Sequence, residues 1–438
     1  MASNQESDRA LTKQYMPLAT AAGIGSMLGS GIIVGLSATI TVWQAGLGLT
    51  TGQVGIISAG LTFAIAFGSL FAGTITKTFG LIRSFNWINL FYAIGAAICI
   101  FANGFGMLLA GVIITGLASG ADLPISLTVV SHDAPDETTS ANLVSSTQLF
   151  WQVGVFASYI CSFIVSTMSG AAGARVVFTI LAVCAVITWI WRTFSKKFAR
   201  FHVEGDKLRA AEKAANPNSD AAKVSLKDVL FGSDKKFLKF FAAILIFYVC
   251  WNLLANTWGQ FQTFTLVQAH ASQSFATGAG IVLNVVSLVA TMIFTSVAGG
   301  KHRNQAFFFG IAVQFFAMIG MAISGSSLWP IVIAIAIYNM GNPIAGEAIY
   351  KVWTQESFPV ETRSAIQGFI NGFSRLCCGL FAFVTPYLVL PSHIRTSMWG
   401  FAGIVAVACI SGIIMMRLQK HYRVGAAENA REDATNRQ

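Results

Sequence analysis

Long apolar stretches separated by short polar connections dominate the chain. A helix needs about 20 apolar residues to cross a hydrocarbon core about 30 Å thick. Lipid-spanning segments must be helices or closed barrels, because their backbone polar groups find no water to bond. The pattern therefore predicts an all-α membrane protein with twelve transmembrane helices. They are expected at residues 17–46, 53–79, 84–103, 105–131, 143–168, 174–195, 237–267, 274–299, 304–324, 328–355, 364–390 and 396–417.

Three polar segments organise these stretches into two halves. Residues 1–16 and 418–438 are polar tails, and residues 196–236 form a long Lys- and Ala-rich connection. Six stretches precede that connection and six follow it. We therefore expect two six-helix bundles, over 17–195 and 237–417, joined by a linker loop.

Charges in the short connections predict the orientation. Transmembrane proteins keep most of their loop cations in the cytoplasm. One set of connections carries Lys77, Arg83, Lys301, Arg303 and Arg363, whereas the opposite set carries only Arg175 and Arg395. Both tails and the linker are thus expected in the cytoplasm, with the chain a multi-pass protein of the cell (inner or plasma) membrane.

Composition supports a membrane protein and argues against a nucleic-acid partner. Hydrophobic residues make up 55% and charged residues 11% of the chain, whereas soluble domains carry about 25% charged residues. The net charge is +10, but 12 of the 28 Lys and Arg residues lie between Arg192 and Lys239. Such clustering is typical of a cytoplasmic loop. The expected partners are the lipid bilayer and a small solute, with no nucleic acid, and the protein is expected to be a monomer.

The Cys and His residues suggest no further chemistry. All seven Cys lie within apolar stretches, so we expect free thiols, no disulfide framework and no metal site. The six His map to loops or helix ends, which argues against a buried histidine relay. No nucleophile–base grouping or ATP-binding motif is evident, so we expect neither an enzyme nor an ATP-driven pump, and no cofactor other than H⁺ as the coupling ion.

Four charged residues inside the apolar stretches are the best clue to function: Asp122, Glu347, Lys351 and Arg375. Each costs about 2.5–3.5 kcal/mol at the centre of a membrane helix on insertion scales, so such residues usually have a partner or a task. Their formal charges sum to zero. This balance favours ion pairing or ion coupling, as in a transporter.

Each of these charges has two interpretations. Asp122, in Gly120-Ala-Asp122-Leu-Pro124, is either a structural carboxylate buried against a helix end or an arginine, or a proton carrier. Glu347 and Lys351 are four residues apart and so lie on one helix face. They are either a pair that neutralises itself, or a solute-binding Lys351 that Glu347 holds in place or exchanges a proton with. Arg375 either pairs with Asp122 or Glu347, or clamps a carboxylated substrate.

A row of amides marks the seventh stretch. Asn252, Asn256 and Gln260 recur every four residues, so they lie on one helical face. That face must look inward in lipid. It either bonds neighbouring helices or binds a polyhydroxylated ligand, with Trp251 or Trp258 as an apolar platform.

Similar turns recur at matching places in the two halves. Gly73-Thr-Ile-Thr-Lys77-Thr-Phe-Gly80-Leu-Ile-Arg83 follows the second stretch, and Gly299-Gly300-Lys301-His302-Arg303 follows the eighth. Asp133-Ala-Pro135 follows the fourth stretch, and Glu356-Ser-Phe358-Pro359 the tenth. Repeats of this kind favour a duplicated, alternating-access transporter.

These motifs resemble the major facilitator superfamily and, within it, the sugar porter family. Trp353-Thr-Gln-Glu356-Ser-Phe358-Pro359-Val-Glu-Thr-Arg363 is similar to that family's turn after helix ten, and Gln148-Leu-Phe-Trp-Gln152-Val-Gly154 to its helix-five motif. The resemblance implies sugar contacts from helices five and seven, and gating turns built around Gly73, Gly80, Arg83, Glu356, Pro359 and Arg363.

The chain departs from this family at four places. Gly29-Ser30-Gly31 stands where many proton-linked sugar porters carry an Asp, and Val112 near their helix-four Arg. His132 and Thr139 replace an acidic residue and an Arg of the helix-four turn. Lys351 replaces a Trp of the sugar pocket. Coupling is therefore expected from other groups.

The sequence predicts a secondary active transporter that imports a small polar solute (a sugar, polyol or sugar acid) by proton symport with alternating access. The expected proton-coupling residues are Asp122, Glu347 and Arg375. The expected substrate-binding residues are Gln148, Gln152, Trp251, Asn252, Asn256, Gln260 and Lys351. The alternatives are a drug or organic-acid exporter of the same fold and a non-transporting membrane sensor or enzyme.

Overall fold

The computed structural model describes residues 2–215, 235–297, 302–358 and 360–422, and all the regular structure in them is helical. The chain divides into two compact units, unit 1 from Met1 to Ala221 and unit 2 from Ala222 to Gln438. Each unit is described separately below.

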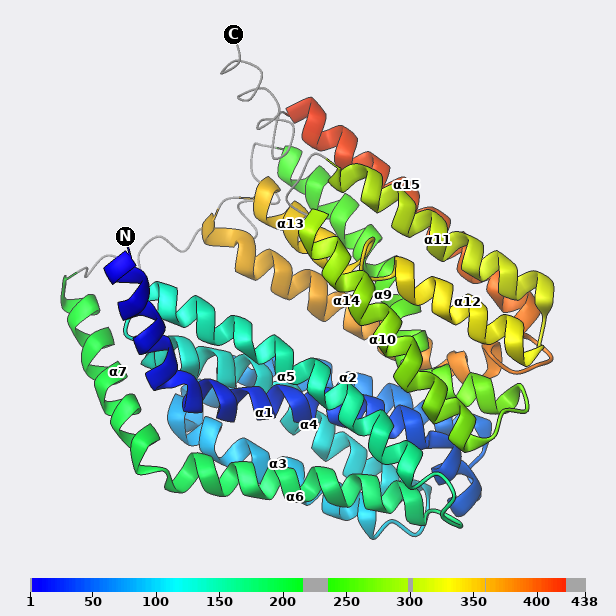
Figure 1. Cartoon of the computed structure of the whole chain (residues 1–438), viewed down its shortest axis with the longest axis horizontal. Helices are drawn as coiled ribbons and strands as arrows, with labels where there is room; N and C mark the ends of the chain where they lie inside the picture. Colours follow the sequence, from blue (N-terminus) through cyan, green and yellow to red (C-terminus); the bar gives the residue numbers. More distant parts are fainter. Residues whose placement is uncertain (1, 216–234, 298–301, 359, 423–438) are drawn as a thin grey trace. The chain divides into compact units, whose positions relative to one another are not determined.

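Unit 1 consists of long helices and one helix across their ends. α1 is bent in its first part, and α7 turns sharply away from α6 and runs across one end of the unit (Figure 1). The bounds are α1 Ala2–Leu47, α2 Thr51–Phe79, α3 Leu81–Ile100, α4 Phe105–Asp133, α5 Glu137–Ile164, α6 Ala172–Phe194 and α7 Lys196–Ala215.

α1 and α4 form the middle of unit 1. α1 packs against α4, α5 and α6, while α4 also packs against α2, α3 and α7. Glycines bring α2 and α4 into close contact: a Cβ at Gly120 would lie 2.7 Å from the Ile65 Cα, and one at Gly68 would meet the backbone of Leu117. Backbone contact at this distance tolerates no side chain at either position.

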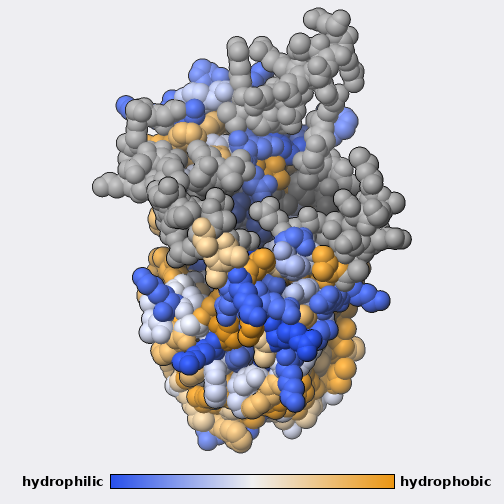
Figure 2. Space-filling view, turned by 90° about the vertical axis from the view of Figure 1, so that its left-hand side faces the viewer, coloured by the Kyte–Doolittle hydropathy of each residue, from blue (hydrophilic) through white to orange (hydrophobic). Residues whose placement is uncertain are grey.

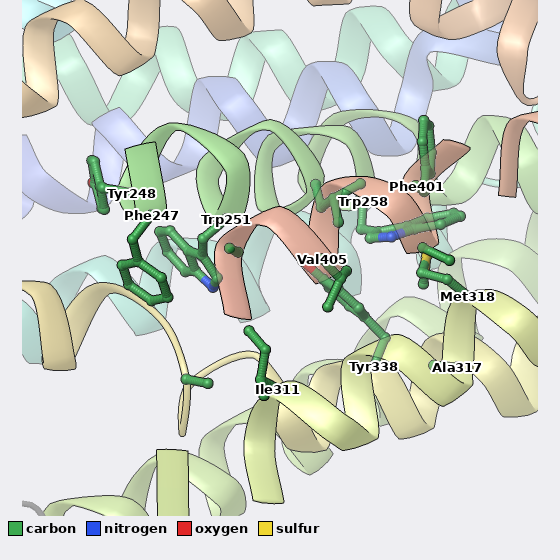
Figure 3. Packing of buried hydrophobic residues seen from close by; sticks show 14 of the residues in the cluster. Phe247, Tyr248, Trp251, Trp258, Ile311, Ala317, Met318, Tyr338, Phe401 and Val405 are labelled. Atoms are coloured by element: carbon green, nitrogen blue, oxygen red, sulfur yellow. The ribbon is translucent and has the colours of Figure 1, made fainter. Parts of the chain in front are cut away.

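Unit 2 packs its helices around a core rich in aromatic residues. α9 packs against α14 and α15, and α11 against α12 and α15. Figure 3 shows part of this core, with Trp251 and Trp258 on α9 and Tyr338 on α12. The bounds are α9 Lys236–Gln268, α10 Gln273–Val297, α11 Arg303–Ser324, α12 Leu328–Gly341, α13 Glu347–Ser357, α14 Val360–Leu388 and α15 Ile394–Tyr422.

The outer surface is apolar along the helices. On α10, Val282, Val285, Val289 and Met292 are exposed and follow one face. Figure 2 looks onto the end where the N-terminus and α7 lie, and hydrophilic residues gather there while hydrophobic ones cover the flanks of unit 1. Exposed apolar surface of this extent needs lipid contact.

Ten helices of the described residues are long and apolar enough to cross a membrane, and two apolar helices, Leu149–Ile164 and Leu328–Gly341, are shorter. The predicted all-helical membrane fold is thus confirmed. The twelve-span count and the cytoplasmic location of both termini stay predictions.

Three boundaries differ from the sequence prediction. The predicted polar tail is helical from Ala2 onward and forms the first part of α1, which continues through Pro17. Part of the predicted linker loop forms α7. The predicted tenth helix, 328–355, is interrupted between Gly341 and Glu347. Pro343 lies in this interruption; its ring clashes with the preceding turn and it lacks an N–H, which explains the break.

The close contact of α2 with α4 predicts a position-specific response to alanine. Gly120→Ala should lower the stability of the protein by about 1–3 kcal/mol, because the added methyl group must push the Ile65 backbone away. Gly106→Ala, on the same helix with nothing within 4 Å of the added Cβ, is the control. Thermal unfolding in detergent micelles measures both, and equal midpoints for the two variants would contradict the packing.

Candidate functional site

A buried ion pair lies in the middle of unit 1. Arg192 Nη1 on α6 lies 2.6 Å from Asp122 Oδ1 on α4, and Nη2 donates to Oδ2 at 3.3 Å. Asp122 is 2% exposed and Arg192 is 1% exposed. The guanidinium therefore engages both carboxylate oxygens away from solvent, in the geometry that suits a planar cation.

The remaining Arg192 donors are also satisfied. Nε and Nη2 donate to the Ala21 carbonyl at 3.2 and 2.8 Å, and Nη1 donates to the Phe85 carbonyl at 3.1 Å. Nη2 also reaches the Ser126 hydroxyl, which in turn donates to Asp122. The guanidinium carbon lies 4.1 Å from the centre of the Phe85 ring, a cation–π contact. Arg192 thus joins α1, α3, α4 and α6.

The partner of Asp122 is not the residue that the sequence suggested. Arg375 lies in unit 2, where its Nε donates to Asn371 Oδ1 at 3.2 Å along α14. Arg192 lies next to the cation-rich linker, but it is inside the predicted span 174–195. Its position within a predicted span was the signal that could have identified it.

Glu347 and Lys351 form the predicted i, i+4 pair. Lys351 Nζ lies 2.7 Å from Glu347 Oε1 in the first turns of α13, and both side chains are about half exposed, at 46% for Lys351 and 50% for Glu347. The pair is therefore neutralised within its own helix.

The amide row of α9 faces the interior of unit 2. Asn252 Nδ2 donates to Ser374 Oγ on α14 at 2.7 Å, and Gln260 Nε2 donates to Asn256 Oδ1 at 2.8 Å. Gln260 is buried, while Asn252 and Asn256 are half-buried. This arrangement leaves hydrogen-bonding capacity in the half-buried amides, because each carries two donors and an acceptor.

Aromatic residues cluster around Trp251, the residue that precedes Asn252. Trp251 stacks on Tyr248, with ring centres 5.5 Å apart. The ring centres of Tyr248 and of Tyr350 on α13 lie 3.9 Å apart. The Trp251 indole donates to the Asn342 carbonyl in the helix interruption at 3.3 Å. Trp258 instead packs in the core near Phe401 (Figure 3). Of the two tryptophans, Trp251 is therefore the one that bonds to the interruption itself, whereas Trp258 packs against Tyr338 of α12.

The helix-five glutamines lie one turn apart on α5, which packs against α1. The Ser30 hydroxyl of α1 donates to the Trp151 carbonyl at 2.8 Å, next to Gln152, which is half-buried. The side chain of Gln148 lies outside the described residues.

The predicted gating residues divide between the units. In unit 2, Glu356 accepts two bonds from Arg303, at 2.6 and 3.1 Å, and one from Gln419 at 3.0 Å. In unit 1, Gly80 connects α2 to α3 with φ of 90°, a left-handed conformation that favours glycine. Gly73 and Arg83 are exposed. Pro359 and the Arg363 side chain lie outside the described residues.

One histidine is not at a surface, contrary to the sequence prediction. His202 of α7 is 7% exposed, and its Nδ1 lies 2.5 Å from Asp133 Oδ2 at the end of α4. Asp133 Oδ1 also contacts His132 Nδ1 at 2.8 Å. Because α7 was expected to be a loop, nothing in the sequence placed His202 against α4.

No group of three or more His, Cys, Asp or Glu residues suited to a metal ion occurs in the part of the chain that the structure describes. Each unit therefore carries its own candidate groups: the buried ion pair in unit 1, and the amides, aromatic residues and charged pair in unit 2.

Comparison with known proteins decides the family. The sequence matches the family described as Sugar (and other) transporter over residues 3–421. The chain belongs to this family. It is thus a transporter of the major facilitator superfamily and a multi-pass membrane protein, not an enzyme.

A curated relative covers almost the whole chain. The minor myo-inositol transporter IolF of Bacillus subtilis is 28% identical over 94% of this chain and 92% of its own length.

Two solved structures share the fold. A D-xylose–proton symporter superposes with a TM-score of 0.71 at 15% identity, over 91% of this chain and 96% of its own. A peptide transporter superposes with a TM-score of 0.66 at 14% identity, over 94% of this chain and 95% of its own. Such distant likeness shows the fold alone, since the two proteins have different solutes.

The ion pair of unit 1 predicts a non-additive pair of substitutions. Arg192→Met should destabilise the protein by about 3–5 kcal/mol, because it leaves the Asp122 carboxylate buried without a cation. Adding Asp122→Leu to that variant should recover part of the loss. Thermal unfolding of the wild type, both single variants and the double variant measures the coupling, and additive losses would show that the two groups do not stabilise each other.

Proposed function

We propose that this transporter imports a neutral sugar or polyol by proton symport, with alternating access, across the cell membrane and with both termini in the cytoplasm. The observation that carries the proposal is the inward-facing amide row of α9 beside the aromatic group of Trp251, Tyr248 and Tyr350. The similarity to a myo-inositol transporter supports a polyol or sugar as the solute. The shared fold with a D-xylose–proton symporter is consistent with coupling to protons.

Solute recognition follows from hydrogen-bonding capacity. A polyol presents many hydroxyls that both donate and accept, and amides match both roles. Asn252, Asn256 and Gln260 supply such groups on one face, with Trp251 as the apolar platform for the C–H face of the ring. In unit 1, Gln148 and Gln152 of α5 stay predicted solute contacts.

The charged pair of α13 favours a neutral solute over a sugar acid. Lys351 lies 2.7 Å from Glu347, so its charge is already balanced and a solute carboxylate would have to displace that acid. A hydroxyl instead can bond to the ammonium or the carboxylate without separating them. In this role Lys351 binds solute, Glu347 exchanges a proton, and Arg375 is a switchable partner of Glu347.

Asp122 is proposed as the main proton-coupling acid. When it takes up a proton, Arg192 loses its counter-charge but keeps its bonds to the Ala21 and Phe85 carbonyls and to Ser126. In the proposed protonated state the guanidinium therefore keeps hydrogen-bond partners but lacks its counter-charge. Loss of the charge–charge attraction loosens the joint between α4 and α6, which couples proton uptake to a change in helix packing.

Amide substitutions test solute recognition. Asn252→Ala and Asn256→Ala should each raise the half-saturation concentration for uptake about 2–10-fold, as expected for a lost bond of about 0.5–1.5 kcal/mol. Asn304→Ala, at an exposed position at the start of α11, is the control. Uptake of labelled myo-inositol and D-xylose into proteoliposomes measures the effect, and unchanged half-saturation in both amide variants would reject the site.

Proton coupling is tested by removing the carboxylate. Asp122→Asn should abolish accumulation driven by a pH gradient while solute exchange across the membrane remains measurable. Asp206→Asn, an exposed acid on α7, should keep pH-driven accumulation. Accumulation by the Asp122→Asn variant at the wild-type level would show that another group carries the proton, and efflux against the gradient would favour an exporter instead.

A further inference from the structure

The interruption between α12 and α13 leaves backbone carbonyls without helical partners. α12 ends at Gly341 and α13 begins at Glu347. The Tyr338 and Gly341 carbonyls still accept from the N–H four residues on, at Asn342 and Ala345. In the described residues, the Asn342 and Ala345 carbonyls have no such backbone bond. Inside a membrane protein these groups must be bonded by other parts of the protein.

Side chains from two neighbouring helices supply these bonds. Gln314 of α11 donates both hydrogens of its Nε2, to the Gly341 carbonyl at 3.1 Å and to the Ala345 carbonyl at 3.2 Å. From α9, the Trp251 indole donates to the Asn342 carbonyl at 3.3 Å. The interruption is thus held by Gln314 and by the proposed solute platform.

Gln314 is unusual for its helix. It is 1% exposed, and all residues from Ala306 to Ala322 other than Gln314 are apolar or glycine. An amide in such a place is retained only if its donors are used. Close packing keeps it within reach, since a Cβ at Gly310, one turn earlier on α11, would lie 2.9 Å from Ile344 Cβ.

We propose that Gln314 is a positioning residue that holds the interrupted segment and thereby sets the solute site. Its side-chain amide bonds to backbone carbonyls of the interruption. By bonding Gly341 and Ala345 it fixes where α13 begins, and so places Glu347, Tyr350 and Lys351 relative to α9. Its effect on solute binding rests on the proposed function; its effect on the segment does not.

The first test measures the segment without any solute. Gln314→Met keeps the size of the side chain but removes both donors, and Gln305→Met makes the same change at an exposed position of α11. Hydrogen–deuterium exchange of the full-length protein in nanodiscs should show amides of residues 341–347 exchanging about tenfold faster in Gln314→Met. Residues of unit 1 should match the wild type, and so should residues 341–347 of Gln305→Met, because the Gln305 side chain bonds to His302 at the start of α11.

Two outcomes would overturn the proposal at this stage. Unchanged exchange over residues 341–347 would show that Gln314 does not hold the segment. Equal acceleration throughout unit 2 would show a general loss of stability rather than a local role.

The second test measures the consequence for transport, with myo-inositol as the probe. Gln314→Met should raise the half-saturation concentration at least fivefold, with the amount of protein in the membrane and the maximal rate within twofold of wild type. Lower abundance with unchanged half-saturation would indicate a purely structural residue and overturn the proposal.

A double variant tests whether Gln314 and Trp251 act on the same segment. Because both side chains hold one segment, Gln314→Met combined with Trp251→Phe should raise half-saturation by less than the product of the single effects; a full product would overturn the shared role. If the wild type transports no sugar or polyol but exchange still changes locally, the proposed function fails and the positioning role of Gln314 stands.

Discussion

The buried ion pair of Asp122 and Arg192 is the interaction on which unit 1 depends. A lone charge in a low-dielectric interior is very costly, and a buried pair is tolerated only when its remaining hydrogen bonds are made. Arg192 meets this condition with backbone carbonyls from α1 and α3 and with the carboxylate and hydroxyl of α4. One side chain therefore ties four helices together, and a change in the charge of Asp122 acts on all of them.

Unit 2 meets a comparable constraint with neutral groups. Its interrupted helix needs bonds for carbonyls, not for charges, and Gln314 and Trp251 provide them. The charged residues Glu347 and Lys351 pair with each other at a half-exposed position. Both units contain an arginine–carboxylate pair, since Arg303 bonds to Glu356 in unit 2. Of these two, only the unit 1 pair has both partners fully buried, and unit 2 adds an amide and aromatic surface beside a break in a helix.

The chain departs on its first helix from the sugar porters that it resembles. Gly29-Ser30-Gly31 provides no acid on the first helix, where many proton-linked members have one. An acid–arginine pair is nevertheless present, between α4 and α6. In the proposed function this pair takes the coupling role that those members assign to the first helix.

Local sequence determined the helical membrane fold, the pair of Glu347 with Lys351 and the inward face of the α9 amides. Each of these follows from apolar length or from a spacing of four residues within one helix. Only the tertiary structure decided that Asp122 pairs with Arg192, that α7 brings His202 to Asp133, and that Gln314 bonds the carbonyls of a broken helix. Those contacts join residues far apart in the chain, and their choice depends on which helices pack together, which no periodicity within a single segment encodes.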